Sequence, residues 1–404
     1  MIEVLETPVD DPGRRALREH LARRSVLVVT GSGGVGKTTS AAALGLFGAQ
    51  LGRRTLVITI DPAKRLANAL GLTALSHVPQ RIDGALTAVD GAAAPGELFA
   101  MMLDPKAAWD DMLMRTAPDA ATAQKILENR FYGTLSRDLP GAHEFIACEC
   151  LHHLTSSGQW DLVVLDTPPT SNALDFLEAP ARILAVLDND AFRYFAQRKQ
   201  SLGLRFLDSS IVQGAAGRAQ SVLARFTGAE VLEELGDFIV LLRDLYDPLT
   251  RRTRGLQDML RGEGTRFLVV TSPAPPSLAE ARLLLDELAR RGLPLGALLV
   301  NRVTPTAGQA VALLASPHWE AHLARAGLAA GDVARLAAAL DEAVRQQAKV
   351  AEVETHNVDE LLLRHTRGAP LVRVPRLPDA VHDTKRLVEL LPWLGRLPGT
   401  SASM

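Results

Sequence analysis

The sequence predicts an α/β protein built on a mostly parallel β-sheet that is flanked by helices. Apolar, β-rich runs alternate with helical patterns along the chain, which is the order expected for parallel strands joined by crossover helices. Several of these runs, such as 162–165 and 267–270, are continuously apolar, as strands covered on both faces are. With 404 residues, of which 47% are hydrophobic, the chain is long enough to bury a large core.

The strands and insertions follow from the same patterns. The predicted strands are 25–30, 55–60, 85–90, 161–166, 266–271, 296–301 and 370–374. Two long intervals, 91–160 and 181–264, show helical periodicity and little strand pattern. We therefore expect helical insertions there, packed together as a lobe on one domain that spans residues 1–404. A third helical stretch is expected from 307 to about 364.

Composition narrows the class of partner. The 44 basic and 46 acidic residues leave a net charge of -2, so no overall field attracts nucleic acid or anionic lipid. No stretch approaches the roughly 20 apolar residues that span a bilayer, and the N-terminus lacks a leader pattern. Two cysteines are too few for a disulfide framework. These features predict a cytoplasmic protein with no nucleic-acid partner and no integral membrane segment.

The most informative motif is GSGGVGKTT at residues 31–39. It satisfies the phosphate-binding loop (P-loop) pattern, and it lies between a predicted strand and a helical segment, as that pattern requires. The glycines let backbone amides turn inwards towards phosphate oxygens, while Lys37 would reach the β- and γ-phosphates and the Thr38 hydroxyl would bind Mg²⁺. A glycine-rich turn without a ligand is the alternative. The predicted nucleotide-binding residues of this loop are Gly31, Ser32, Gly33, Gly34, Val35, Gly36, Lys37, Thr38 and Thr39.

Two acids lie at the carboxyl ends of predicted strands. Asp166 ends the strand 161–166, and Asp61 follows the strand 55–60. A P-loop enzyme needs an acid for magnesium, which Asp166 would bind through water, and a group that places the attacking water. Either acid alone could be a helix cap or a turn residue. Both acids beside a P-loop favour the functional interpretation.

Four motifs in order carry a family resemblance: VVTGSGGVGKTT at 28–39, TIDPA at 59–63, VLDTPPT at 164–170 and LVNRV at 299–303. Together they resemble the arsenite-pump and tail-anchored-protein-targeting (ArsA/GET-type) ATPases. That family consists of SIMIBI-type P-loop NTPases with a deviant Walker A motif, which work as dimers. The resemblance covers nearly the whole chain and implies ATP and Mg²⁺ as cofactors.

The resemblance also implies roles for single residues. Asp61 matches the switch I carboxylate that positions the attacking water, and with Lys37 it forms the expected catalytic pair. Asn301 matches the residue that reads the adenine edge, for which a side-chain amide offers both a donor and an acceptor. Pro375, in the segment 374–378, resembles a loop residue that closes over the base. Without the other motifs, Asn301 would be interpreted as an ordinary asparagine at a strand end and Pro375 as an ordinary turn proline. The matched switch II residues are Asp166, Thr167, Pro168, Pro169 and Thr170.

The chain departs from the family at Ser32. The family has a lysine there that crosses the dimer interface to the partner's phosphates, whereas serine can only donate or accept a hydrogen bond. Three alternatives follow: a slow homodimeric ATPase, a non-catalytic nucleotide-dependent regulatory subunit, or a heterodimer with a lysine-bearing paralogue. Lys64 and Arg65 could substitute in part, or could be solvated charges.

Two groups of sulfur-containing residues bear on the substrate of such an ATPase. Cys148 and Cys150 match neither the CxxC zinc pair nor the three-cysteine metalloid site of the family, which disfavours a metalloid-export ATPase. Four such thiols in a dimer could hold zinc or an iron–sulfur cluster, but a buried cysteine is more often a small apolar residue. Four methionines in the insertion 91–160 are compatible with a groove for a hydrophobic protein client or with core packing. They are Met101, Met102, Met112 and Met114.

Overall fold

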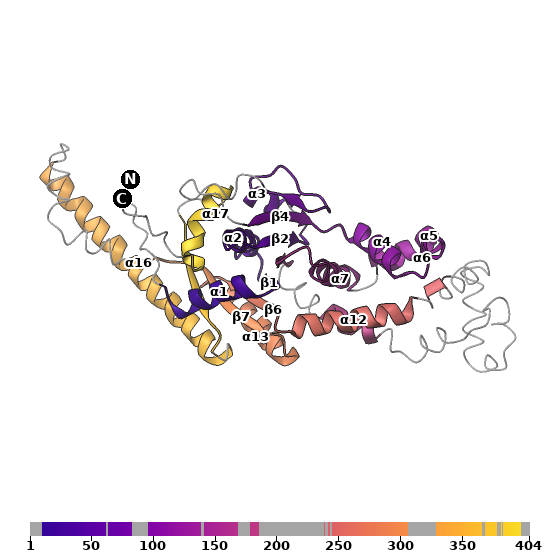
Figure 1. Ribbon diagram of the computed structural model, residues 1–404. Coiled ribbons are helices and arrows are strands. Elements are labelled where there is room, and N and C mark those ends of the chain that lie inside the picture. The colour runs from indigo at the N-terminus through magenta and orange to yellow at the C-terminus, as the bar shows by residue number, and fades with distance from the viewer. Residues whose placement is uncertain are drawn as a thin grey trace, which may run out of the picture. The chain divides into compact units, whose positions relative to one another are not determined.

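The computed structural model divides the chain into two compact units, which are described separately (Figure 1). Unit 1 comprises Met1–Met102, Ser157–Ala173 and Arg261–Met404, and unit 2 comprises Leu103–Ser156 and Leu174–Leu260. The structure describes residues 10–61, 64–82, 96–138, 141–168, 178–185, 238, 241–242, 245–305, 329–365, 368–377, 381 and 383–396.

Unit 1 contains an eight-stranded sheet of order β3-β4-β2-β5-β1-β6-β7-β8. All neighbouring strands are parallel except β3 and β4, which are antiparallel. This confirms the α/β fold with a mostly parallel sheet. The strands are β1 (Val26–Gly31), β2 (Arg54–Thr59), β3 (Gln80–Arg81), β4 (Glu97–Met102), β5 (Leu162–Asp166), β6 (Thr265–Thr271), β7 (Leu295–Val303) and β8 (Leu371–Pro375).

The sheet order places the ends of three strands together. β1 lies between β5 and β6, and β2 lies on the other side of β5. Val29 and Thr59 both pair in register with Asp166. Because parallel strands share one carboxyl edge, the loops that follow β1, β2 and β5 open at the same edge of the sheet. The central strands β1 and β5 are buried along their whole length, which explains their continuously apolar sequences.

Most predicted strands match an observed strand to within two residues, with one clear correction. β4 lies inside the interval 91–160, which was predicted to be a helical insertion. Its residues include Leu, Ala and Met, which favour helices in isolation. All six residues of the strand nevertheless pair in register with β2. Tertiary pairing therefore overrides local propensity here. The predicted strand 85–90 lies outside the described residues.

Helices cover the sheet of unit 1 (Figure 1). The central one, α2, is buried over most of its length and packs against β2 and β5. α16 lies in the predicted helical stretch from 307 to about 364, of which residues 307–328 are not described. The helices are α1 (Pro12–Arg23), α2 (Lys37–Gln50), α3 (Arg65–Ala69), α13 (Pro275–Arg291), α16 (Ala330–His365), α17 (Thr384–Leu390) and the 3₁₀ helix η3 (Leu391–Leu394).

The described part of unit 2 is helical. A core pair joins the rings of Trp109 and Phe145, whose centroids are 5.7 Å apart. Each of the first two helices begins after an aspartate whose side chain accepts a backbone N–H of the first turn, as helix N-caps do. The helices are α4 (Pro105–Thr116), α5 (Ala120–Glu128), α6 (Arg130–Asp138), α7 (Ala142–Ser156) and α12 (Tyr246–Arg261), whose last residue is assigned to unit 1.

The four methionines do not supply one exposed surface. Met101 and Met102 belong to strand β4, and Met101 is buried. Met112 is buried in α4, and only Met114 is exposed, at 48%. Three of the four are occupied in strand pairing or in core packing, which favours the core-packing alternative for these methionines over a client groove.

An ion triad with a buried carboxylate links three helices of unit 2. Glu149 on α7 is 2% exposed. Its Oε1 lies 2.8 Å from Nη1 of Arg252 on α12, and its Oε2 lies 3.3 Å from Nη2 of Arg115 on α4. The carboxylate thus compensates two guanidinium groups.

Replacing Glu149 with alanine is expected to lower the free energy of unfolding by about 1–3 kcal/mol, because the two half-buried guanidinium groups lose their buried hydrogen-bond acceptor. Urea denaturation followed by circular dichroism would measure this change. Glu128→Ala, which removes an exposed carboxylate from the same unit, should change stability by less than about 0.5 kcal/mol. Equal stability of the two variants would contradict the role given to the triad.

Candidate functional site

The P-loop runs from the end of β1 to the first turn of α2. α2 begins at Lys37, and its N-cap is Gly36, with φ 98° and no side-chain cap. The first backbone N–H groups of a helix have no partner inside the helix, and with no cap they form a binding site for an anion such as phosphate. The sequence therefore places an anion site at the carboxyl edge of the sheet.

Two loop glycines have no room for a side chain. A Cβ on Gly36 would lie 2.3 Å from Nδ2 of Asn301, and a Cβ on Gly31 would lie 2.0 Å from the carbonyl oxygen of Val270 on β6. Gly36 also has a backbone conformation that residues with a Cβ rarely adopt. Close packing against β6 and β7 thus explains why glycine occupies both positions.

Lys37 is folded into the loop that precedes it. Its Nζ donates a hydrogen bond to the carbonyl oxygen of Ser32, at 2.8 Å, and the residue is 7% exposed. Burial lowers the pKa of the Lys37 ammonium, and the nearby charge of Asp166 opposes this effect. The side chain is therefore positioned beside the loop amides.

Asp166 joins the P-loop helix to the neighbouring strands. Its Oδ2 accepts hydrogen bonds from Oγ1 of Thr38, at 2.8 Å, and from Oγ1 of Thr59, at 3.0 Å. Its Oδ1 is buried and has no hydrogen-bond partner among the described residues. Burial raises the pKa of Asp166 to about 6, although the two hydroxyl groups and Lys37 stabilise its charged form. A buried carboxylate oxygen without a partner is chemically suited to bind a cation directly or through water.

Asp61 lies beside this group. Its backbone N–H donates to Oγ1 of Thr59, at 3.2 Å, so one hydroxyl contacts both acidic positions. The Asp61 side chain is 18% exposed, and its Oδ2 lies 3.3 Å from Nη1 of Arg65. Arg65 therefore pairs with Asp61 within the subunit. Thr59 was not among the predicted site residues, although its place just before the Ile-Asp-Pro run was a usable signal.

The predicted switch II segment starts at the same edge. The backbone N–H and Oγ1 of Thr167 both donate to the carbonyl oxygen of Val29 on β1, at 3.1 and 3.0 Å. These bonds attach the segment to the strand that leads into the P-loop. Pro168 follows in the described chain, whereas Pro169 and Thr170 lie outside it.

Ser32 is a buried residue of this site. It is 4% exposed, and its hydroxyl has no hydrogen-bond partner in the part of the chain that the structure describes. The hydroxyl of Thr30, the residue before Gly31, is also buried and has no hydrogen-bond partner among the described residues. Ser32 therefore contributes its carbonyl to Lys37 and keeps a free hydroxyl within the loop.

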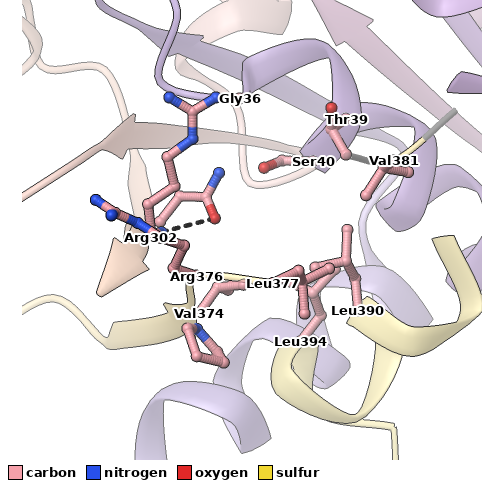
Figure 2. Close-up of a pocket in the computed structure, with 12 residues that line it drawn as sticks. Gly36, Thr39, Ser40, Arg302, Val374, Arg376, Leu377, Val381, Leu390 and Leu394 are labelled. Carbon is pink, nitrogen blue, oxygen red and sulfur yellow. Dashed lines mark hydrogen bonds between the residues drawn. The ribbon is translucent and has the colours of Figure 1, made fainter. Parts of the chain in front are cut away.

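A second part of the site is a cavity of about 310 Å³ beside the P-loop (Figure 2). It brings together Asn301 at the end of β7 and Pro375 at the end of β8, the two residues that the resemblance assigns to the base. Its apolar residues come from β8, from the segment that follows it and from the C-terminal helices. The cavity is lined by Gly36, Thr39, Ser40, Asn301, Arg302, Val374, Pro375, Arg376, Leu377, Val381, Leu390 and Leu394.

The amide of Asn301 braces the loop. Its Nδ2 donates to the carbonyl oxygen of Val35, at 2.8 Å, and its Oδ1 accepts the backbone N–H of Arg302, at 2.9 Å. A side-chain amide has two donor hydrogens and two acceptor lone pairs, so one of each is left for a ligand. Asn301 thus couples the cavity to the P-loop backbone.

The two cysteines lie in α7 of unit 2. Burial raises the pKa of Cys150 to about 12 and the pKa of Cys148 well above its usual value. Metals bind the thiolate form, so burial weakens both thiols as ligands. No group of three or more histidine, cysteine or acidic side chains suited to a metal ion occurs among the described residues.

A P-loop between a central parallel strand and a buried helix, with a hydroxyl and a carboxylate beside the loop, defines a P-loop nucleoside triphosphatase. A model of the anion-transporting ATPase family matches residues 24–320, which is more than half of the chain. The chain belongs to this family, whose members are ATPases, and the ArsA/GET-type resemblance is confirmed.

Similar proteins occur in plants, fungi and bacteria. The chain is 26% identical over 300 residues to ATPase GET3B of Arabidopsis thaliana, covering 70% of this chain and 65% of that protein. It is 26% identical to ATPase GET3 of Malassezia globosa, covering 74% and 78%. It is 29% identical to an uncharacterized protein of Streptomyces coelicolor, covering 72% and 65%. The chain thus spans just under two thirds of two of these three relatives.

Among the described helices, none combines the length and the apolar character that crossing a bilayer requires.

Proposed function

We propose that this chain binds ATP with Mg²⁺ and hydrolyses it slowly as a dimer. The observation that carries the proposal is the arrangement of Lys37, Thr38 and Asp166 around the uncapped start of α2. A cation, a hydroxyl and a carboxylate at a helix N-terminus are the groups that a magnesium–triphosphate needs.

The residues present fit a magnesium ion. Oδ1 of Asp166 has no partner among the described residues, and the Thr38 hydroxyl lies beside the same carboxylate. Thr38 would bind the ion directly, and Asp166 would bind it through water. When bound, Mg²⁺ offsets negative charge on the β- and γ-phosphates.

The remaining steps belong to the chain's own side chains. The loop amides and Lys37 hold the phosphates, and Asp61 orients the water that attacks the γ-phosphate. Thr59 keeps Asp61 and Asp166 in register, because its hydroxyl bonds to both. The Asp61–Arg65 ion pair opposes free movement of the Asp61 carboxylate in the subunit.

Ser32 is the basis for slow turnover. Nothing at this position supplies a cation, so the charge that develops on the transferring phosphoryl group lacks one source of stabilisation. Binding should be spared, because the loop amides, Lys37 and the Thr38-bound ion supply the ground-state contacts. Ser32 also favours a second candidate function, a regulatory subunit or heterodimer partner whose nucleotide state matters more than its turnover.

Replacing Ser32 with lysine is expected to raise ATP turnover by about tenfold or more while leaving ATP affinity nearly unchanged. Ser32 is 4% exposed in the single subunit, so the new side chain must extend out of the loop to reach a partner's phosphates. Steady-state phosphate release, with dimerisation measured by sedimentation, tests this expectation.

A mixing experiment identifies the subunit on which the lysine acts. Subunits carrying both Ser32→Lys and Lys37→Ala lack their own nucleotide but still donate the introduced lysine. Faster turnover after mixing them with wild-type subunits supports action across the interface. No gain for Ser32→Lys in a confirmed dimer would contradict the proposed arrangement.

We further propose that nucleotide state repositions the helical lobes formed by the insertions 91–160 and 181–264, and that the client is a hydrophobic protein. The family resemblance supports this proposal. The four methionines do not, because three of them lie in strand pairing or in core packing. The raised thiol pKa values weigh against a metalloid substrate. Co-purification of an apolar protein in one nucleotide state only would test the client proposal.

A further inference from the structure

The cavity beside the P-loop has two chemically different sides (Figure 2). Arg302 and Arg376 lie on one side, and the labelled side chains of Leu377, Leu390 and Leu394 lie on the other. No aspartate or glutamate is among the described residues that line it. Neither guanidinium group forms a hydrogen bond or an ion pair with a described residue. Two exposed cations, without a partner among the described residues, therefore lie beside a space with an apolar opposite wall.

The backbone holds both arginines in this position. The pairing of β7 with β8 shifts register between Val300 and Val303, so Asn301 and Arg302 form a bulge. Arg302 has φ 60°, a conformation that few residues other than glycine adopt, and Oδ1 of Asn301 accepts its N–H. The N–H of Arg376 donates to the carbonyl oxygen of Val303, at 2.9 Å.

Strained backbone conformations of this kind cluster at active sites and ligand sites. Glycine or asparagine would adopt the same backbone conformation at lower cost, so the bulge alone does not require arginine. The arginine side chain is therefore the feature of this position that needs a separate explanation. Its guanidinium group is planar and weakly hydrated, and it stacks on aromatic faces.

We propose that Arg302 stacks on the purine base of the nucleotide, with Arg376 beside it, and that the base is held between this face and the apolar residues opposite. This rests on the proposed function, which places the triphosphate at the P-loop. The phosphates are assigned to the loop amides, so the cavity beyond Gly36, Thr39 and Ser40 receives the nucleoside. The stacking also gives selectivity for purines, whose larger ring system covers more of the guanidinium plane than a pyrimidine does.

Calorimetric titration of the full chain tests this assignment, with ATP, CTP and inorganic tripolyphosphate as ligands in the presence of Mg²⁺. Arg302→Lys keeps the positive charge but removes the planar guanidinium group. Arg302→Gln removes both the guanidinium group and the charge. Both should weaken ATP binding by about five- to tenfold and narrow the preference for ATP over CTP. Tripolyphosphate, which has no base, should bind both variants as it binds the wild type.

Arg282→Gln provides the matched control, because Arg282 is an exposed arginine of α13 outside this cavity. It should leave all three affinities unchanged, and thermal unfolding should be the same for every variant. Full ATP affinity in Arg302→Lys, or a parallel loss of tripolyphosphate binding, would overturn the stacking role and leave the ATPase proposal intact. A wild-type chain that binds neither ATP nor tripolyphosphate would overturn the proposed function, and this assignment with it.

Discussion

Replacing Lys37 with alanine is expected to abolish nucleotide binding, with a loss of affinity of at least about a hundredfold. Lys37 is the basic residue of the P-loop itself, and its ammonium is held in the loop by the carbonyl of Ser32. A triphosphate bound there without it would face the Asp166 carboxylate with less compensating charge. Equilibrium binding of labelled ATP measures the effect.

The matched control for this variant is Lys385→Ala, which removes an exposed lysine from α17 in the same unit. It should bind ATP as the wild type does. Thermal unfolding of both variants shows whether the fold survives, since Lys37 also donates one buried hydrogen bond. Wild-type affinity in a folded Lys37→Ala protein would disprove the assignment of the phosphate site.

Replacing Asp166 with asparagine is expected to reduce Mg²⁺-dependent hydrolysis by at least about a hundredfold, because the carboxylate that fixes the ion is lost. Asparagine still offers an oxygen that can accept from Thr38 and Thr59, so the loop should keep its shape. Phosphate release measured over a range of Mg²⁺ concentrations tests this. Asp258→Asn, an exposed change on α12, is the control. Unchanged hydrolysis in Asp166→Asn would remove Asp166 from the ion site.

The same variant should alter how the stability of the metal-free protein depends on pH. The pKa of Asp166 is raised from 3.8 to about 6 in the folded chain. The folded state therefore binds the proton more tightly than the unfolded state does, and this contribution to stability is present below about pH 4 and lost as the pH rises through about 6. It is on the order of 2–3 kcal/mol.

Asp166→Asn should remove that dependence and be more stable than the wild type above pH 7 in the presence of EDTA. Magnesium should reverse the order, because it stabilises the ionised carboxylate of the wild type. Urea unfolding between pH 4 and 8, with and without Mg²⁺, gives both comparisons. Parallel pH curves for the two metal-free proteins would contradict the buried, unpartnered carboxylate.

Much of the fold was predictable because its signals are local. Strands β1, β5 and β6 are apolar runs buried on both faces, and such runs have few alternative structures. β4 was missed because its residues suit a helix, and only pairing with β2 makes them a strand. The edge strand β3 has two residues and carries no periodic pattern at all.

The candidate site divides in the same way. The P-loop could be predicted because its chemistry lies within nine consecutive residues, and Asp61 and Asp166 because each follows an apolar strand. Thr59 was missed because its role depends on the register that places it opposite Asp166. The proposed role of Arg302 could not be predicted, because it depends on a bulge between β7 and β8 that no local sequence pattern indicates.

The class of this protein follows from short segments of its sequence. Gly31, Gly36, Lys37 and Thr38 at their spacing, between a strand and a helix, predict a phosphate site, because backbone amides do most of the binding. Which residues from other strands join that site depends on the tertiary structure. Thr38 meets Asp166 because β1 and β5 are neighbours in the sheet, although β2, β3 and β4 separate them along the chain. Long-range strand pairing sets such contacts, and it is not encoded in any short segment.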